Sequence, residues 1–350
     1  MSELRIIIGE KEEISEQYLA QLFALRQQHE EEIFPFIPPS LEFYKESWKI
    51  PDISSRKSLW SLAINEDNLV IGYGIASWNI KFDNLDKAYF SIYVSRLFRR
   101  KGYGSLLLKN ILEKLPSQIE KLNSGSSENC DGLPFLRNLK TEESYVEMIS
   151  IADLADFNLN QIINQAQEQK EKALAKGYEI IFVDNANYAD YLDYPEFVKV
   201  VESIWNDMPR ENLSDEDSKV TVELHQEIYD YYKLRGAKYF TYVAMHKQTK
   251  KIVGFTTAAV YKYQPWVTWQ DDTGIIHEHR GHGLGLAIKY QMLKKLLQET
   301  KVKYWFTGNN HKNEHMIKIN RILKHKKRDS EIIFEFDRKL VSNHLAKKTS

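Results

Sequence analysis

The sequence predicts a protein of the α/β (α+β) class with two tandem domains, each a mixed, mostly antiparallel sheet flanked by helices. Two observations lead to this prediction. The chain has 350 residues, which is long for a single hydrophobic core. One order of elements also occurs twice: strand, turn, strand, strand, glycine loop, helix. Arg280 in the second loop follows Arg99 in the first by 181 residues, a spacing typical of duplicated domains.

The first copy is indicated by apolar runs and by a helical repeat. Strands are expected at 59–64, 69–78 and 89–94, with a turn at 65–68. The loop Arg99-Arg100-Lys101-Gly102-Tyr103-Gly104 follows. Leu107, Ile111 and Leu115 then recur every fourth residue, which predicts a helix with one buried face.

The second copy repeats this order. Strands are expected at 239–246, 252–261 and 267–276, with a turn at 247–251. The loop Arg280-Gly281-His282-Gly283-Leu284-Gly285 precedes a helix whose apolar face carries Leu286, Tyr290, Leu293 and Leu297.

The remaining segments place the domain boundary. Residues 160–176 are rich in Gln, Glu and Lys, which predicts an exposed, weakly packed helix at the start of the second unit. We therefore expect domains at 1–155 and 156–350. A strand is expected at 178–183, a loop at 124–131 and a last strand at 332–336.

The two glycine loops are candidate phosphate sites. The first turn of a helix has unpaired N–H groups and a partial positive charge. Glycines there, Gly102 and Gly104 or Gly283 and Gly285, let the backbone approach phosphate oxygens without a Cβ in the way. Arg99 and Arg280 are placed to add a charge-assisted contact.

Two other nucleotide loops fit less well. A Rossmann loop needs three spaced glycines and an acidic residue after the next strand. A P-loop needs Gly-Lys-Ser/Thr, and Ser105 has no Lys before it. A single strand-to-helix turn would explain one R-x-x-G-x-G loop, but two in the same context favour a phosphate site.

These motifs resemble the acetyl-CoA-binding core of GNAT N-acetyltransferases, whose loop reads Gln/Arg-x-x-Gly-x-Gly/Ala. The second copy resembles a tandem subgroup distantly akin to mycothiol synthase. The residues that carry this likeness are 205–209, 269–273, 279–285, Asn309, Asn313, Met316 and Asn320. The likeness is good over about 178–323 and looser over 59–139.

The resemblance implies a fold and a set of site residues. In such folds two strands splay apart and the pantetheine arm lies against strand backbone, which would be that of Thr273 to Ile276, with Ile275 and Ile276 in contact. Acetyl-CoA would then be held by Ile275, Ile276, Asn313 and the two loops, 99–104 and 280–285. Where the family helix ends Leu-Gly-Phe or Leu-Gly-Tyr, this chain has Leu323-Lys324-His325 and Leu139-Lys140-Thr141, and the usual tyrosine acid is not visible in either copy.

The implied reaction is direct transfer of an acetyl group to the amine of a small molecule or peptide in a ternary complex, most readily in the C-terminal domain. A lysine-like amine is neutral in only about one molecule in several thousand at pH 7, so a carboxylate base helps. Asp272 is our first candidate base and Asp271 the second. Because side chains alternate along a strand, only one should face the substrate, and Asp272 should share its face with Gln270. Asn320 is a candidate beside the thioester, with helix capping or a satisfied polar contact as the alternative.

Composition limits the other functions. The formal net charge is -1, so no overall field favours nucleic acid or an anionic membrane. Cys130 is the single cysteine, which excludes a disulfide framework. The histidines 277, 279, 282, 311 and 315 lack a third ligand at a familiar spacing, so no metal is expected. We expect a cytoplasmic protein without a membrane span.

Three functions remain open on the sequence alone. The first is an acetyl-CoA-dependent N-acyltransferase acting on a small-molecule amine. The second is a non-catalytic acyl-CoA sensor on the same scaffold, which the missing tyrosines favour. The third is a two-domain α/β protein that binds NADH or ATP instead.

Overall fold

The structure is a computed structural model that describes residues 4–35, 37, 40–184 and 193–349. Its internal contacts divide the chain into two compact units. The N-terminal unit comprises 1–146, 210–216 and 331–350, and the C-terminal unit comprises 147–209 and 217–330. These units differ from the contiguous halves 1–155 and 156–350, because the end of each half adds a strand to the other half's sheet.

This exchange involves two strands. β6 (Glu143–Asp153) pairs over 147–153 with β11 (Tyr304–Asn310), inside the C-terminal unit. β12 (Lys326–Asp337) pairs over 331–337 with β5 (Lys121–Ser127), inside the N-terminal unit. Antiparallel ladders between segments this far apart in sequence cannot be seen in local patterns.

The N-terminal unit has the strand order β1-β2-β3-β4-β5-β12, in which only β4 and β5 pair in parallel. Its further strands are β1 (Arg5–Gly9), β2 (Arg56–Ile64), β3 (Val70–Asn79) and β4 (Lys87–Val94). Its helices are α1 (Glu16–Ile33), α2 (Leu41–Trp48), α3 (Tyr103–Lys114), α4 (Gly132–Arg137) and α11 (Arg338–Thr349), with 3-10 turns at Lys11–Glu13 and Arg96–Phe98. One core joins the sheet to α3, α4 and α11, and a second, aromatic core joins it to α1 and α2.

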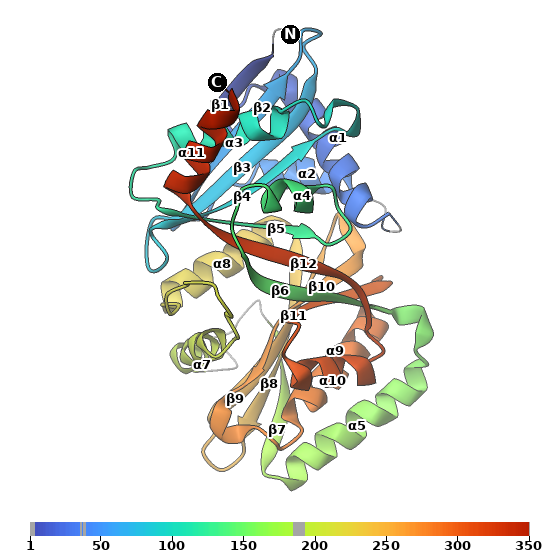
Figure 1. Ribbon diagram of the computed structural model, residues 1–350. Helices are drawn as coiled ribbons and strands as arrows, with labels where there is room; N and C mark the ends of the chain where they lie inside the picture. Colours follow the sequence, from blue (N-terminus) through green and yellow to red (C-terminus); the bar gives the residue numbers. More distant parts are fainter. Residues whose placement is uncertain (1–3, 36, 38–39, 185–192, 350) are drawn as a thin grey trace. The chain divides into compact units, whose positions relative to one another are not determined.

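The C-terminal unit has the order β6-β11-β10-β9-β8-β7, with β10 and β11 as its parallel pair. Its further strands are β7 (Tyr178–Asp184), β8 (Ala237–His246), β9 (Ile252–Tyr261) and β10 (Gln264–Ile275). Its helices are α5 (Leu159–Ala175), α7 (Tyr194–Asn206), α8 (Val222–Leu234), α9 (Leu284–Glu299) and α10 (Glu314–Ile322), with 3-10 turns at Leu154–Asp156 and His277–His279. α5 and α9 pack on one face of this sheet and α7 on the other (Figure 1).

Two local expectations were wrong. Residues 124–131 were expected to form a loop, but 124–127 belong to β5, where Gly125 pairs with Ile333. Pairing with a distant strand overrides the low strand propensity of a Ser/Gly segment. The helix expected to pack weakly, α5, buries Ile162, Ala166 and Ala173 in the same core as α9.

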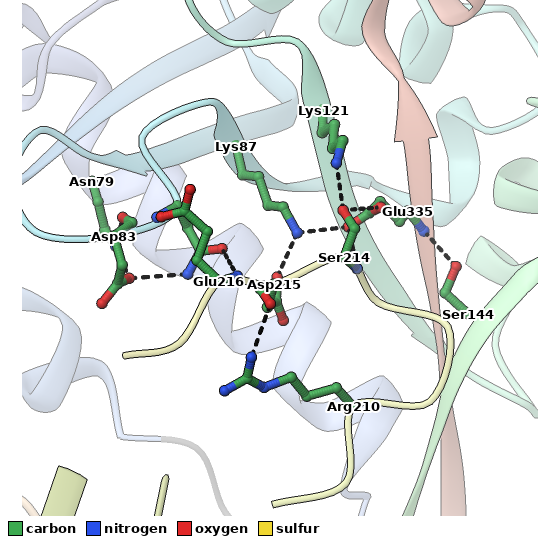
Figure 2. A network of polar contacts seen from close by, with 11 residues as sticks. Asn79, Asp83, Lys87, Lys121, Ser144, Arg210, Ser214, Asp215, Glu216 and Glu335 are labelled. Carbon is green, nitrogen blue, oxygen red and sulfur yellow. Dashed lines mark hydrogen bonds and ion pairs between the residues drawn. The ribbon is translucent and has the colours of Figure 1, made fainter. Parts of the chain in front are cut away.

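A buried lysine secures the short segment 210–216 in the N-terminal unit (Figure 2). The Lys87 side chain is 6% exposed, and its Nζ lies 2.7 Å from Asp215 Oδ1 and 2.9 Å from Glu335 Oε2. Burial by itself would lower the pKa of Lys87, but the two carboxylates raise it above its ordinary value. Ser214 Oγ also contacts Glu335 Oε1 at 2.6 Å. This irregular segment therefore has its polar groups paired with strands β4 and β12.

Candidate active site

In each unit the two parallel strands pair briefly and then separate. The β4–β5 ladder covers 87–89 and 121–123, although β4 continues to Val94. The β10–β11 ladder covers 267–270 and 304–307, although β10 continues to Ile275. Past these ladders and within the described residues, the strand that leads into the glycine loop is paired on one side only, with β3 or with β9. The splayed strands expected from the sequence are present in both units.

Each loop starts its helix through a left-handed glycine. Gly102 is the N-cap of α3 with φ 84°, and Gly283 is the N-cap of α9 with φ 80°. A Cβ at either position would meet nothing within 4 Å, so the backbone conformation, not crowding, calls for glycine. The first intrahelical bonds are made by the N–H groups of Leu106 and Ala287. The N–H groups of the preceding turn therefore point outward at the positive end of each helix.

The two arginines of the loops occupy matching positions. Arg99 Nε donates to Val94 O at 2.8 Å, and Arg280 Nε donates to Ile275 O at 2.9 Å. Each carbonyl belongs to the last residue of the strand before the loop. These bonds hold the loops against the strand ends.

Each guanidinium also meets a carboxylate from the helix on the opposite face. Arg99 Nη2 lies 2.5 Å from Glu32 Oε2 and Arg99 Nη1 lies 2.8 Å from Asp131 Oδ2. Arg280 forms an ion pair with Asp207, next to the end of α7. Burial would raise the pKa of Glu32, but Arg99 and Tyr93 hold it below its usual range. The arginines thus brace the loops, which leaves backbone N–H groups as the main donors there.

A lysine outside both motifs lies at the second loop. Lys176, just after α5, donates through Nζ to His282 O at 3.0 Å. It adds positive charge beside the start of α9, where none of the first-turn residues is acidic. The pattern of the sequence offered no signal for it, because α5 precedes the loop by more than a hundred residues.

The acidic pair of β10 lies in a β-bulge. Gln270 is paired with Ala258 and Thr273 with Thr256, so Asp271 and Asp272 together oppose Thr257. Strict alternation is broken at such a place. The expectation that only one aspartate faces the substrate side, and that Asp272 shares the face of Gln270, was therefore wrong.

The contacts of the two aspartates put them on the face that α7 covers. Trp205 Nε1, at the end of α7, donates to Asp272 Oδ2 at 2.8 Å. Tyr239 of β8 hydrogen-bonds Asp271. Gln270 points to the other face, where Ala258 and Phe240, its neighbours across the strands, share the α9 side of the sheet.

The surroundings raise the pKa of both carboxyls. Protein surrounds Asp271 on most sides although its surface remains accessible to water. This loss of solvent, with the neighbouring charge of Asp272, raises the pKa of Asp271 to about 7. Burial also raises the pKa of Asp272, partly offset by the Trp205 bond. Asp271 is thus an accessible carboxyl that titrates near neutrality, as a general base should.

The N-terminal unit has no such pair at the corresponding place. Offset by 181 residues, Asp271 and Asp272 correspond to Phe90 and Ser91. The β3–β4 register runs without a shift, and Phe90 is 1% exposed in the core beside α3. This unit therefore has the glycine loop and the splayed strands, with Phe90 and Ser91 in place of the two aspartates.

The two asparagines singled out from the sequence have structural contacts. Asn313 is the N-cap of α10 and its side chain accepts from Met316 N at 3.2 Å. Asn320 is 2% exposed, accepts from Lys289 Nζ at 2.6 Å and donates to Asn309 Oδ1 at 2.5 Å. Asn320 thus lies inside the unit, one side chain back from the splayed end of β11.

Lys289 was not recognised in the sequence. It lies in α9 with no exposed surface, and burial lowers its pKa to about 7. The signal was available: Lys289 is three residues after Leu286 and four before Leu293, on the apolar stripe of the helix. Tyr239 was missed for a different reason, since only the sheet brings it to Asp271.

Histidines near the second loop pack with a tyrosine. His279 Nδ1 lies 2.9 Å from Tyr178 Oη, and the rings of His246 and His282 surround the same tyrosine. Within the described residues no group of three or more His, Cys, Asp or Glu is arranged to hold a metal ion. In the same part of the chain, every helix is too short or too polar for a membrane span.

Comparison with known families agrees with this geometry. The model of the Acetyltransferase (GNAT) family matches twice, at residues 20–137 and 199–319. The chain belongs to the GNAT acetyltransferase family. The two matches include both glycine loops, and the second includes the bulge. A search of curated proteins finds no match.

Solved GNAT structures share the fold over the whole length. A tandem GNAT protein from the clavulanic acid biosynthesis pathway has a TM-score of 0.73 at 17% identity, covering 96% of this chain and 99% of that one. A GCN5-related N-acetyltransferase from Sphaerobacter thermophilus has a TM-score of 0.63 at 12% identity, covering 95% of this chain and 96% of that one. A glucosamine N-acetyltransferase region of a fungal multi-domain protein has a TM-score of 0.62 at 13% identity, covering 96% of this chain and 38% of that one. At these identities the likeness shows the GNAT fold alone.

Proposed function

We propose that this GNAT protein transfers an acetyl group from acetyl-CoA to an amine of a small molecule or peptide, and that the C-terminal unit carries out the transfer. The observation behind this proposal is the β10 bulge, which turns two carboxyls to one face of the strand that leads into the second glycine loop. Bulges often lie next to active sites because they redirect side chains. The N-terminal unit has neither the bulge nor the carboxyls.

The cofactor-binding residues follow from the loop geometry. The pyrophosphate would meet the first-turn N–H groups of α9, with Lys176 close by, and the pantetheine arm would meet the free edge of β10 near Ile275. The N-terminal loop at α3 offers the same N–H groups. Arg280 and Arg99 belong to the proposed binding residues because their side chains hold the two loops against the strand ends.

Asp271 is the better of the two candidate bases. It is accessible, whereas Asp272 is partly buried and engaged by Trp205. The ammonium form of the acceptor first gives a proton to the Asp271 carboxylate. The neutral amine nitrogen then bonds to the acyl carbon, the C–S bond breaks, and the second proton of the nitrogen passes to the departing sulfur, so that CoA leaves as a thiol. Tyr239 stays protonated, because burial and the adjacent Asp271 raise its pKa far above neutrality. Its hydroxyl can therefore donate to Asp271 and orient it.

Calorimetric titration with acetyl-CoA tests the binding step first. We expect binding, and Gly283→Glu should remove it from the C-terminal loop by placing a charged side chain at a left-handed position. Gly102→Glu is the matched variant for the N-terminal loop. A folded protein that binds no acetyl-CoA would exclude the acyltransferase.

Release of CoA thiol in the presence of an amine tests the transfer step. Asp271→Asn should lower kcat by about a hundred- to ten-thousand-fold, the usual range for a general base. Acetyl-CoA affinity should be unchanged. Equal turnover by this variant would exclude Asp271 as the base.

A second function fits the N-terminal unit. Its loop and splayed strands, with Phe90 and Ser91 in place of the acid pair, favour binding of acyl-CoA without transfer. Binding of two acetyl-CoA per chain, with all turnover lost in Gly283→Glu and retained in Gly102→Glu, would support this non-catalytic role.

A further inference from the structure

Helix α8 covers part of the sheet beside Asp271 without packing tightly. None of its 13 residues is fully buried, although its sequence is amphipathic. A helix of this kind normally buries an apolar stripe against its sheet. The residues of α8 therefore keep part of their surface accessible, on the same side of the unit as the proposed base.

Tyrosines form the surface between α8 and β8. The ring of Tyr239 lies 5.1 Å from that of Tyr229 and 5.6 Å from that of Tyr232, measured between centroids. All three side chains are half-buried. A cluster of half-buried aromatic rings beside a polar group is a common lining of a ligand site.

The neighbouring strand extends this aromatic surface. Tyr239 and Trp269 are both paired with Ala259, so they share one face of the sheet. Trp269 is 38% exposed, which is unusual for a tryptophan in the middle of a sheet. Asp271 follows two residues later on that face and hydrogen-bonds Tyr239.

The charges on this surface select the sign of a ligand. Two carboxyls, Asp271 and Asp272, lie at its base, and tyrosine faces attract cations through their ring quadrupoles. The Arg235 guanidinium already lies over the rings of Tyr231 and Tyr261, at 5.3 and 5.9 Å from their centroids. A ligand carboxylate bound here would be repelled by Asp271 and Asp272. It would also have to compete with the rings of Tyr231 and Tyr261 for the Arg235 guanidinium.

We propose that this tyrosine surface, defined by Tyr229, Tyr232, Tyr239 and Trp269, binds the acceptor, and that the acceptor is a primary amine on an apolar or aromatic body without a carboxylate. The ammonium group approaches Asp271 across the tyrosine rings, and the apolar body lies on Trp269. This inference rests on the proposed function, since it places the acceptor beside the proposed base.

Direct binding of three matched probes tests the acceptor class. Phenethylamine, phenylalanine and phenylacetate are titrated by calorimetry into the full chain in the presence of CoA, which carries no acyl group to transfer. We expect phenethylamine to bind, phenylalanine to bind at least about tenfold more weakly, and phenylacetate not to bind. Equal affinity for phenethylamine and either carboxylate would overturn the proposal.

Two variants locate the binding surface. Tyr232→Leu should weaken phenethylamine binding about three- to thirtyfold, as expected for loss of a cation–π contact. Tyr304→Leu is the control, because Tyr304 starts β11 opposite Val267, away from Asp271. Unchanged binding in Tyr232→Leu, with the fold intact by circular dichroism, would place the amine elsewhere.

The two proposals fail in different ways. Phenethylamine binding without acetyl transfer would support the tyrosine surface as a binding site and contradict the proposed acyltransferase activity. Acetyl transfer to phenylalanine as efficient as to phenethylamine would keep the acyltransferase and overturn the acceptor class.

Discussion

The Nζ of Lys289 lies 2.6 Å from Oδ1 of Asn320, and both side chains are buried inside the C-terminal unit. An ammonium group has only donors, so Asn320 must turn its oxygen to Lys289 and its NH₂ to Asn309. One buried lysine thus sets the amide orientation of Asn320. Through Asn320 it also fixes the side-chain oxygen of Asn309, which lies on the splayed end of β11. Trp305 also lies beneath the ammonium, at 5.3 Å from Nζ to the ring centroid.

The burial of Lys289 makes stability depend on pH. Its pKa falls from 10.5 in the unfolded chain to about 7, so between these values the unfolded state binds more protons than the folded one. The free energy of unfolding contributed by Lys289 should rise with pH in this window, by up to about 1.4 kcal/mol per pH unit. The difference between the wild type and Lys289→Met, measured by urea unfolding from pH 7 to 9, should show this slope. A difference that does not change with pH would mean that Lys289 stays charged.

The pKa of Asp271 predicts the pH profile of the reaction. The group acts as a base only when ionised, and the loss of solvent around this accessible carboxyl, with the charge of Asp272, raises its pKa to about 7. At saturating amine and acetyl-CoA, kcat should rise as pH increases through 7, and at pH 6 it should be about a tenth of its plateau. Asp271→Glu should shift this profile, whereas Asp271→Asn should lose it along with most activity. A profile flat between pH 6 and 8 would contradict the assignment.

Asp271 should also reduce stability as pH rises. Its folded-state pKa lies above the ordinary value of 3.8, so the protonated form is favoured by folding. The contribution of Asp271 to the free energy of unfolding should therefore fall as pH rises from about 4 to about 7, and Asp271→Asn should be more stable than the wild type at pH 8. Chemical unfolding of the wild type and of Asp271→Asn at pH 4 and pH 8 measures this contribution as the difference between the two proteins, and a variant less stable than the wild type at pH 8 would contradict it.

Lys140 and Lys324 have φ angles of 61° and 56°, at the positions where the family helix usually ends in glycine. A left-handed conformation costs a residue with a Cβ about 1–2 kcal/mol. Lys140→Gly should raise the free energy of unfolding by about 1 kcal/mol. Lys324→Gly should gain less, because Lys324 Nζ donates to Asp156 O at 2.6 Å.

A matched control for Lys140→Gly lies in α10. Lys318 is an exposed lysine inside that helix, so Lys318→Gly should lower the free energy of unfolding by about 1 kcal/mol. If both glycine variants changed stability in the same direction, the left-handed strain at Lys140 would be refuted.

Arg338 connects the last helix to the end of α3 in the N-terminal unit. Its Nη1 donates to Pro116 O at 2.6 Å and Ile119 O at 2.9 Å, and its Nη2 donates to Leu112 O at 2.7 Å and Leu115 O at 2.9 Å. Arg338→Met should lower the free energy of unfolding by about 2–4 kcal/mol, because carbonyls at the end of a helix lose a charged donor.

The control for Arg338 is an exposed arginine of the same unit. Arg137 pairs with Glu143 at 2.7 Å with more than half of its side chain exposed, so Arg137→Met should change stability by less than about 1 kcal/mol. Hydrogen exchange of the α3 amides in Arg338→Met should accelerate. Exchange as slow as in the wild type would show that Arg338 does not hold this helix end.

Local patterns in the sequence determined much of this protein. The two glycine loops, the meander of strands before each and the helix after each follow from residue spacing, because turns and amphipathic faces depend on neighbours along the chain. Gly102 and Gly283 have the left-handed conformation that glycine accepts most readily. The duplication could therefore be predicted from residue spacing, and the GNAT fold from the resemblance of these loops and motifs to that family.

Only the tertiary structure decided which residues meet at the candidate site. The bulge at Asp271 depends on the register between β9 and β10, and the contact of Asp271 with Tyr239 depends in addition on the pairing of β8 with β9. The exchanged strands β6 and β12 pair with segments more than 150 and more than 200 residues away, and Lys289 is buried only because α5, α10 and the sheet surround α9. Such long-range pairings and burial depend on the free energy of the whole fold, and no window of sequence contains them.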